Sequence, residues 1–122
     1  MLPYCDNQGV GLVPYFPLAG GFLTGKHKRG EPAPVGSRGE SSPYVQQYMT
    51  DANYLFVERL AAWAHERGHT SGEAAQAWLL AQPRVCSVIS GATRMEQLLE
   101  NVKAAEWVLT SAEAAEITAL TA

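Results

Sequence analysis

The stretch that most constrains the fold runs from Val13 to Lys26 and reads Val-Pro-Tyr-Phe-Pro-Leu-Ala-Gly-Gly-Phe-Leu-Thr-Gly-Lys. It passes from a short apolar segment into a glycine-rich turn and ends on a lysine. Exposed backbone N–H groups beside a cation favour an anionic ligand. Glycine suits such a turn because it lets a ligand approach the backbone and adopts positive φ angles at little cost. The spacing is not that of a P-loop, and an ordinary glycine-rich loop remains the alternative.

Length and composition favour one soluble globular domain, since the 122 residues are 47% hydrophobic and 17% charged. A net charge of −3 argues against a nucleic-acid binder or an anionic-membrane binder, because no broad positive surface is available. The apolar runs are too short to span a bilayer, and no signal-peptide pattern follows Met1. The isolated Cys5 and Cys86 and the three histidines lack metal-ligand spacing. We therefore expect a reduced, cytoplasmic protein without a metal site.

Two short apolar runs, residues 9–16 and 85–89, predict strands. Their continuous apolar character favours burial on both faces of a parallel sheet, although Pro14 removes a donor from the ladder. Each run leads into a glycine turn, the second around Gly91. Because ligands bind beyond the carboxyl ends of parallel strands, we expect both turns on the same rim.

Helical patterns fill most of the second half. Residues 51–68 place apolar side chains on one face, with Asp51 as the expected cap and Gly68 as the expected end. Three capping boxes, Thr70 to Glu73, Thr93 to Glu96 and Thr110 to Glu113, open further helices. The helix over about 94–105 is expected to bury Met95, Leu98, Leu99, Val102 and Ala105.

Residues 27–50 are predicted to form a long loop, because the segment is rich in glycine and proline and has little periodicity. Basic side chains concentrate at this end of an otherwise acidic chain: Lys26, Lys28, Arg29 and Arg38. The segment is either a solvated loop or a flap that closes over a negatively charged ligand.

Three segments together resemble the C-terminal part of aldo-keto reductases. They are Pro-Tyr-Phe-Pro-Leu-Ala-Gly-Gly-Phe-Leu-Thr-Gly-Lys (14–26), Ala-Trp-Leu-Leu-Ala-Gln-Pro (77–83) and Ser-Val-Ile-Ser-Gly-Ala-Thr-Arg-Met-Glu-Gln-Leu-Leu-Glu-Asn-Val (87–102). The family folds as a TIM (β/α)8 barrel and reduces aldehydes and ketones with NADPH. The resemblance implies an α/β fold class: the C-terminal part of an incomplete TIM barrel, with two parallel strands and flanking helices.

The same resemblance implies a single partial domain over residues 1–122. Its expected parts are a strand and loop over 9–50, helices over 51–82, a strand over 85–89 and helices over 94–122.

The resemblance also implies an NADP(H) site. Tyr15 matches the aromatic residue that stacks on the nicotinamide ring, and Lys26 matches a lysine that pairs with cofactor phosphate. The backbone is expected to follow the ribose and pyrophosphate at Pro17, Leu18, Ala19 and Gly21. Arg38 matches a flap arginine loosely. The adenosine end is expected at Gly91, Thr93, Arg94, Gln97, Glu100 and Asn101, where a helix N-terminus favours the 2′-phosphate.

The sequence also departs from the family. Phe16 replaces a common serine, and Ser90 and Met95 replace common prolines. No motif matches the catalytic tetrad of Asp, Tyr, Lys and His, so the chain alone is not expected to reduce carbonyl compounds. We expect NADP(H) binding, with either a homo-oligomer or a missing N-terminal barrel half as partner. The alternatives are a non-catalytic self-associating module and a truncated relic.

Overall fold

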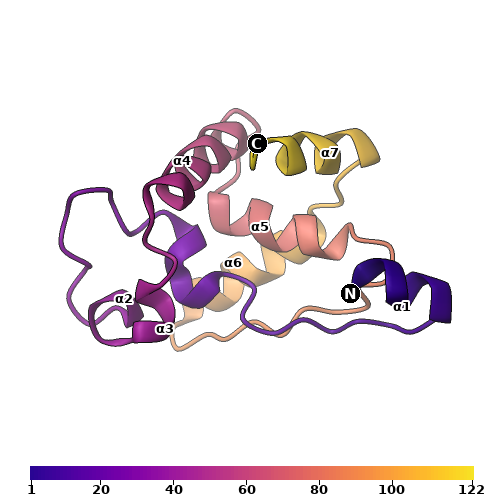
Figure 1. The fold of residues 1–122 in the computed structure, drawn as a ribbon, viewed down its shortest axis with the longest axis horizontal. Helices are drawn as coiled ribbons and strands as arrows, with labels where there is room; N and C mark the ends of the chain where they lie inside the picture. The colour runs from indigo at the N-terminus through magenta and orange to yellow at the C-terminus, as the bar shows by residue number, and fades with distance from the viewer.

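In the computed structural model, which describes residues 1–122 in full, the chain forms helices without a β-sheet (Figure 1). The elements are α1 (Leu2–Gln8), the 3-10 helix η1 (Ala19–Thr24), α2 (Arg38–Ser41), α3 (Pro43–Gln46), α4 (Asp51–His65), α5 (Ser71–Leu80), α6 (Met95–Glu106) and α7 (Ser111–Ala119). Figure 1 shows α5 and α6 in the middle of the molecule, α4 and α7 above them, and α2 and α3 at one end. None of the helices is both long and apolar enough to span a membrane.

The expected fold class, an α/β arrangement with two parallel strands of an incomplete TIM barrel, is wrong for this chain. The two apolar runs lie side by side (Figure 1), but they pair only at two isolated parallel bridges, Leu12 with Val85 and Tyr15 with Ile89. Neither run forms a strand of the kind that the apolar pattern predicts.

Proline explains why the ladder stops. The Leu12 N–H donates to the Arg84 carbonyl at 2.7 Å, and the Cys86 N–H donates back to the Leu12 carbonyl at 2.9 Å. The next donor on this edge belongs to residue 14, which is a proline and has none. The pairing then slips by one residue, because the Pro14 carbonyl accepts from the Ile89 N–H at 2.9 Å.

The apolar interior consists of two clusters. The larger joins α4, α5 and α7, and its buried residues are Leu60, Trp63, Ala64, Ala74, Ala75, Ala77, Leu109 and Ile117. The smaller joins η1, α3 and α4 through Phe22, Val45 and Val57. The predicted face of the helix after residue 51 is confirmed, and α5 packs closely against its neighbours through small alanine side chains.

The predicted helix caps are partly right. Thr110 and Glu113 form the expected capping box, with the Glu113 N–H 3.1 Å from the Thr110 hydroxyl and the Thr110 N–H 2.9 Å from the Glu113 carboxylate. Gly68 takes the left-handed conformation, with φ of +75°, just after α4. The expected cap at Asp51 is wrong, because the Thr50 hydroxyl accepts from the Asn53 N–H instead.

The predicted buried face of α6 is also wrong. Met95, Leu98, Leu99 and Val102 are 64%, 48%, 55% and 48% exposed. Ala105 is exposed as well, whereas its neighbour Ala104 is fully buried. The helix turns its small side chain toward α5 and leaves its large apolar side chains in water, because no segment of the chain covers them.

Helix is also present at the start of the chain and in the segment after Lys26. The helix α1 occupies most of residues 1–8. Within the predicted loop over 27–50, α2 and α3 are single turns of helix that pack on η1.

Candidate functional site

The glycine turn after the first apolar run is a strained backbone segment. Gly20 and Gly21 have φ of +69° and +96°, and the flanking Phe16 and Ala19 also have positive φ. The Thr24 hydroxyl closes the turn by donating to the Gly21 carbonyl at 2.7 Å. Several residues outside the ordinary right-handed region in one short stretch indicate a backbone shaped for close approach.

Lys26 folds back over this turn. A Cβ placed on Gly21 would lie 2.7 Å from the Lys26 Nζ and 2.8 Å from its Cε, so only glycine leaves room for the ammonium there. The Lys26 side chain is exposed and forms no salt bridge. The turn therefore carries an unpaired positive charge directly over Gly21.

The second turn ends at the N-terminus of α6. The Gln97 side chain reaches back, and its Oε1 accepts from the Thr93 N–H at 2.8 Å and from the Arg94 N–H at 3.2 Å. The expected capping box from Thr93 to Glu96 is therefore displaced by one residue. The N–H groups of Met95 and Glu96 keep no acceptor within the chain, as the first turn of a helix requires.

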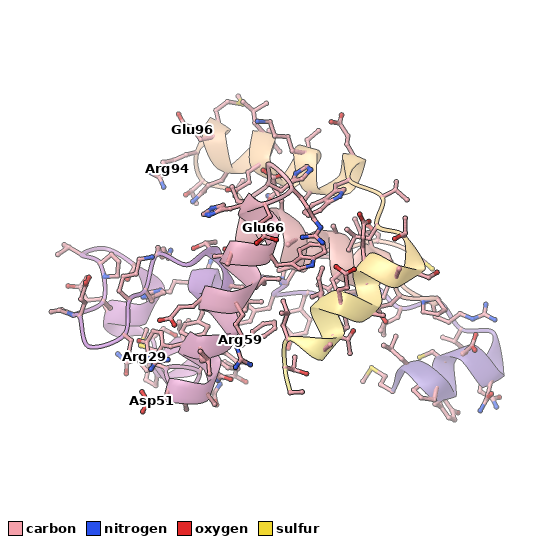
Figure 2. The ribbon with its side chains drawn as sticks, turned by 90° about the horizontal axis from the view of Figure 1, so that it is seen from above. Arg29, Asp51, Arg59, Glu66, Arg94 and Glu96 are labelled. Atoms are coloured by element: carbon pink, nitrogen blue, oxygen red, sulfur yellow. The ribbon has the colours of Figure 1, made fainter.

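Arg94 adds a charge to this end of α6. Figure 2 shows its side chain extending from the start of the helix, with Glu96 beside it. The guanidinium forms no salt bridge. A free cation next to open N–H groups is an arrangement that attracts a phosphate.

Gly72, at the start of α5, lies where η1 and α6 approach each other. A Cβ on Gly72 would lie 3.4 Å from the Glu100 Oε1, 3.7 Å from the Thr24 side chain and 3.8 Å from the Leu18 side chain. Residues from η1 and from α6 thus meet over the same point of α5. The second turn contacts α5 one helical turn further along, where the Ser90 hydroxyl donates to Gln76. No sheet carries the two turns, so the rim on which they were expected does not exist in this chain.

Glu100 and Asn101 are both held by α5 and its cap. The Thr70 hydroxyl donates to the Glu100 Oε1 at 2.7 Å, and the Gln76 amide donates to the Asn101 Oδ1 at 3.0 Å. Asn101 also donates to the Gly91 carbonyl at 3.4 Å. The two side chains expected at the adenine end are therefore oriented before any ligand arrives.

The remaining site residues are less closely gathered. Tyr15 is 77% exposed and lies at the bridge to Ile89, just before both turns. Pro17, Leu18 and Ala19 are half-buried and pass the chain into η1. Arg38 begins α2, which packs against η1, but its exposed guanidinium forms no hydrogen bond and no salt bridge.

His27, directly after Lys26, is an unusual buried group. It is 4% exposed, and neither ring nitrogen has a hydrogen-bond partner in the protein. Its ring stacks on Phe22 and fits against Gly39, where no Cβ would fit. Burial lowers the pKa of His27 below its ordinary value of 6.5, and the charge of Lys26 lowers that pKa further.

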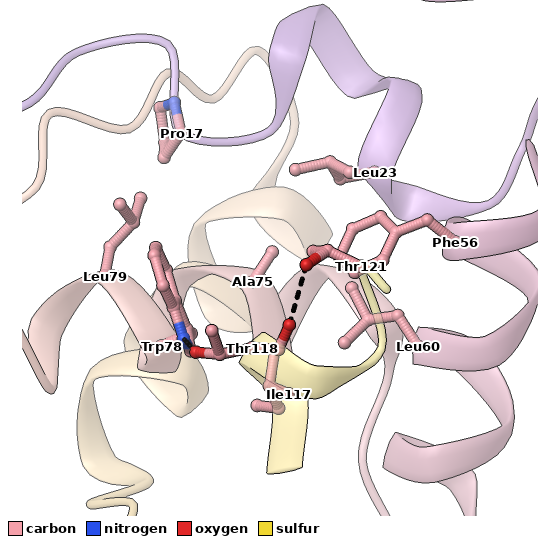
Figure 3. A pocket seen from close by; sticks show the side chains of 10 residues that line it. All are labelled: Pro17, Leu23, Phe56, Leu60, Ala75, Trp78, Leu79, Ile117, Thr118 and Thr121. Carbon is pink, nitrogen blue, oxygen red and sulfur yellow. Dashed lines mark hydrogen bonds between the residues drawn. The ribbon is translucent and has the colours of Figure 1, made fainter. Parts of the chain in front are cut away.

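A separate apolar cavity of about 400 Å³ lies between η1, α4, α5 and α7 (Figure 3). Its side chains include Phe56, Leu60, Trp78 and Ile117. The polar groups at its edge are already paired, since the Trp78 N–H donates to the Thr118 hydroxyl at 3.0 Å. Because it offers no free donor and no cation, this cavity does not suit a phosphate-bearing ligand.

Sequence reasoning missed the residues that support the turns. Gln76, Thr70 and Ser90 hold the adenine-end side chains in place, and Gly72 gives η1 and Glu100 of α6 room to approach α5. One signal was present, because Gln76 is a polar residue among the alanines of the packing face of α5. Nothing in the local sequence distinguished the burial of His27.

Comparison with known proteins connects these features to one family. The model of the Aldo/keto reductase family matches residues 1–122. The chain is 38% identical over 107 residues to L-glyceraldehyde 3-phosphate reductase of Escherichia coli, which covers 85% of this chain and 31% of that protein. It is 40% identical over 108 residues to a probable voltage-gated potassium channel subunit beta of Arabidopsis thaliana, covering 86% of this chain and 33% of that protein.

A solved structure gives the same relationship. The glycerol dehydrogenase of Gluconobacter oxydans superposes with a TM-score of 0.74 at 26% identity, over 98% of this chain and 36% of that one. The chain thus spans about a third of the length of the relatives that it matches.

Proposed function

The chain belongs to the aldo/keto reductase family, and on that basis we propose that it is the NADP(H)-binding part of an oxidoreductase that reduces aldehydes or ketones. The observation that supports the proposal is the contact of both turns with α5. Thr24, in the turn before Lys26, lies against Gly72. Ser90, in the turn before Arg94, donates to Gln76 one helical turn further along. A dinucleotide carries phosphates at separate points, and the cations Lys26 and Arg94 at the two turns would suit them.

The electrostatics favour a cofactor with an extra phosphate. Lys26 and Arg94 are the two cations at the turns, and neither is neutralised by a carboxylate. The net charge of the whole chain is −3, so these two unpaired cations are a local exception on an acidic chain. Unpaired positive charge attracts an anionic ligand locally. We therefore propose NADP(H) as the preferred cofactor.

The direct test is isothermal titration of the pure chain with NADP⁺ and with 2′,5′-ADP. We expect saturable binding of both ligands, and weaker binding of NAD⁺. Absence of heat and of protection against thermal unfolding with every ligand would remove the proposal. A thermal shift is a suitable second readout, because a ligand that binds only the folded state raises its stability.

Removing either cation should weaken binding. Lys26→Ala and Arg94→Ala are each expected to cost about 1–3 kcal/mol of NADP⁺ binding free energy, because charge-assisted hydrogen bonds to phosphate are lost. Lys103→Ala is the matched control, because this exposed lysine lies at the other end of α6 and also forms no salt bridge. Equal affinity of all three variants and the wild type would contradict the assignment of the two cations.

We propose further that hydride transfer requires residues outside these 122. The family's tetrad has no matching motif here, and a proton donor beside the carbonyl oxygen is needed for reduction. When the pure chain is mixed with NADPH and a panel of aldehydes, we expect it to bind NADPH and not to oxidise it. Turnover by the pure chain would overturn this part of the proposal and leave the binding part standing.

A second candidate function is self-association without catalysis. It is favoured by the uncovered face of α6, where four large apolar side chains are about half exposed or more: Met95, Leu98, Leu99 and Val102. Contiguous apolar surface of this kind marks an interaction site more often than free surface. Light scattering together with the 2′,5′-ADP titration separates the candidates, since a stable oligomer without nucleotide affinity supports only this one.

A further inference from the structure

Gln76 is a buried amide in a helix face that otherwise contains small apolar residues. It is 3% exposed and stands between Ala75 and Ala77, both buried. An amide placed there costs free energy unless its hydrogen bonds are made. Both of its polar atoms are bonded: the Ser90 hydroxyl donates to the Gln76 Oε1 at 2.5 Å, and the Gln76 Nε2 donates to the Asn101 Oδ1 at 3.0 Å.

These bonds link three separate segments: α5, the turn at Ser90–Gly91 and α6. The chain of bonds closes on itself, because the Asn101 Nδ2 donates to the Gly91 carbonyl at 3.4 Å. None of the three bonds is needed to form α5, whose own cap is the Thr70 hydroxyl. The role of Gln76 therefore lies outside its own helix.

Only one orientation of the two amides satisfies this closed chain. The Gly91 carbonyl can only accept, so Asn101 must turn its Nδ2 toward it. The Asn101 Oδ1 then faces Gln76, which must present its Nε2, and the Gln76 Oε1 is left for the Ser90 hydroxyl. The orientation of Asn101 is thus determined by a backbone carbonyl on one side and by Gln76 on the other.

We propose that Gln76 is a positioning residue of the nucleotide site, and that it sets which base the site accepts; this inference rests on the proposed function. Held by Gln76, Asn101 keeps an N–H for the ligand. Glu100, bonded to Thr70 through its Oε1, keeps its Oε2 as an acceptor. An acceptor beside a donor matches adenine, whose amine donates and whose neighbouring ring nitrogen accepts. Hypoxanthine presents the opposite pattern, a carbonyl acceptor and a ring N–H donor.

The test compares NADP⁺ with its hypoxanthine analogue in the full 122-residue chain. The variant is Gln76→Met, which keeps the volume and removes both polar atoms. Without Gln76, only the 3.4 Å bond to the Gly91 carbonyl still orients the Asn101 amide, so its oxygen can turn toward the ligand more readily. We expect Gln76→Met to narrow the preference for NADP⁺ over the hypoxanthine analogue about tenfold, the equivalent of one net hydrogen bond of about 1.4 kcal/mol.

Gln82→Met is the matched control, because Gln82 lies just after the same helix and its side-chain amide donates only to the Trp78 carbonyl. It should leave the ratio of the two affinities unchanged. A role of Gln76 in packing alone would lower the unfolding temperature without moving this ratio. A ratio in Gln76→Met equal to that of the wild type overturns the inference.

A ligand-free readout keeps the inference distinct from the proposed function. In the ¹⁵N–¹H spectrum of the wild-type chain, the Asn101 side-chain amide should be shifted and slow to exchange. In Gln76→Met it should move toward the values of a free amide. If the wild type binds neither dinucleotide, the proposed function fails and the role in base choice fails with it. An unchanged Asn101 signal in Gln76→Met overturns the positioning role whether or not the chain binds a nucleotide.

Discussion

At the residue scale, His27 makes folding sensitive to pH. Its pKa is lowered in the folded state by burial and by the neighbouring Lys26, so the unfolded chain takes up its proton first as pH falls. The free energy of unfolding is therefore unaffected by His27 above the ordinary histidine pKa of 6.5. It decreases as pH falls from there toward the lower pKa of His27 in the folded state. Arg38 and Glu40 flank the glycine that packs on its ring, but both are exposed, and the Glu40 carboxylate accepts from the Gly36 N–H.

The corresponding prediction uses His27→Phe, which keeps a ring of similar shape. Because two unpaired buried nitrogens disappear, we expect the variant to be more stable than the wild type by about 1–3 kcal/mol at pH 8. The advantage should grow as pH falls below 6.5. Urea unfolding of both proteins between pH 5 and 8 measures it. A difference that stays constant over this range would show that His27 does not titrate during unfolding.

Gly21 supports a second prediction at this scale. Gly21→Ala should cost about 1–2 kcal/mol of stability because φ is +96°, and it should also push the Lys26 ammonium out of its place. Gly30→Ala is the control, with φ of +75° and no atom within 4 Å of the added carbon. We expect both variants to lose stability, and only Gly21→Ala to lose NADP⁺ affinity in titration. Equal NADP⁺ affinities of the two variants would show that the glycine turn does not contact the ligand.

At the scale of elements, the capping boxes show what local sequence can and cannot predict. The box at Thr110 and Glu113 formed because nothing nearby competes for either side chain. At Thr70 only half of the box formed, because the Glu73 carboxylate pairs with His69 at 2.5 Å. At Thr93 the box moved by one residue, because α6 begins at Met95 with Arg94 as its N-cap, which makes Gln97 rather than Glu96 the residue that accepts from the Thr93 and Arg94 N–H groups. The capping-box spacing predicted the start of each helix, and the hydrogen bonds that nearby side chains make determined which cap formed.

A prediction follows for α7. Thr110→Ala removes the bond that the Glu113 N–H donates to the Thr110 hydroxyl and should cost about 1 kcal/mol. Ser111→Ala, one residue further, removes no side-chain hydrogen bond of the cap and should change stability by less than about 0.5 kcal/mol. Hydrogen exchange should show faster opening of α7 in Thr110→Ala, because the helix docks mainly through Ile117. Uniform exchange in the two variants would contradict a role for the cap.

At the scale of the molecule, the sequence predicted which segments lie side by side better than it predicted the fold class. The two turns contact α5 one helical turn apart, at Gly72 and at Gln76, because the apolar runs before them lie side by side. The runs do not become strands, because Pro14 interrupts the ladder and the chain offers no further segment to pair with their outer edges. The burial of α6 failed for a related reason. An amphipathic pattern identifies the apolar face of a helix, but that face is buried only where a neighbouring element packs against it.

The uncovered face of α6 leads to the last prediction. Leu98→Ser and Val102→Ser together should change the stability of the chain by no more than about 0.5 kcal/mol, because both side chains are already 48% exposed. Leu60→Ser, at a site that is 1% exposed, should cost several times more, since it leaves a cavity and a buried hydroxyl.

The double substitution should act on association instead. If the α6 face mediates contact with a second copy or with another part of a longer protein, sedimentation of the double variant should show a smaller species than the wild type at equal concentration. If the wild type self-associates and the double variant sediments in the same way, the contact lies elsewhere. The next surface is the outer edges of the two paired apolar runs, where Val10, Val13 and Ile89 are about half exposed. Those edges carry unpaired backbone groups as well as apolar side chains, which makes them the next surface to test.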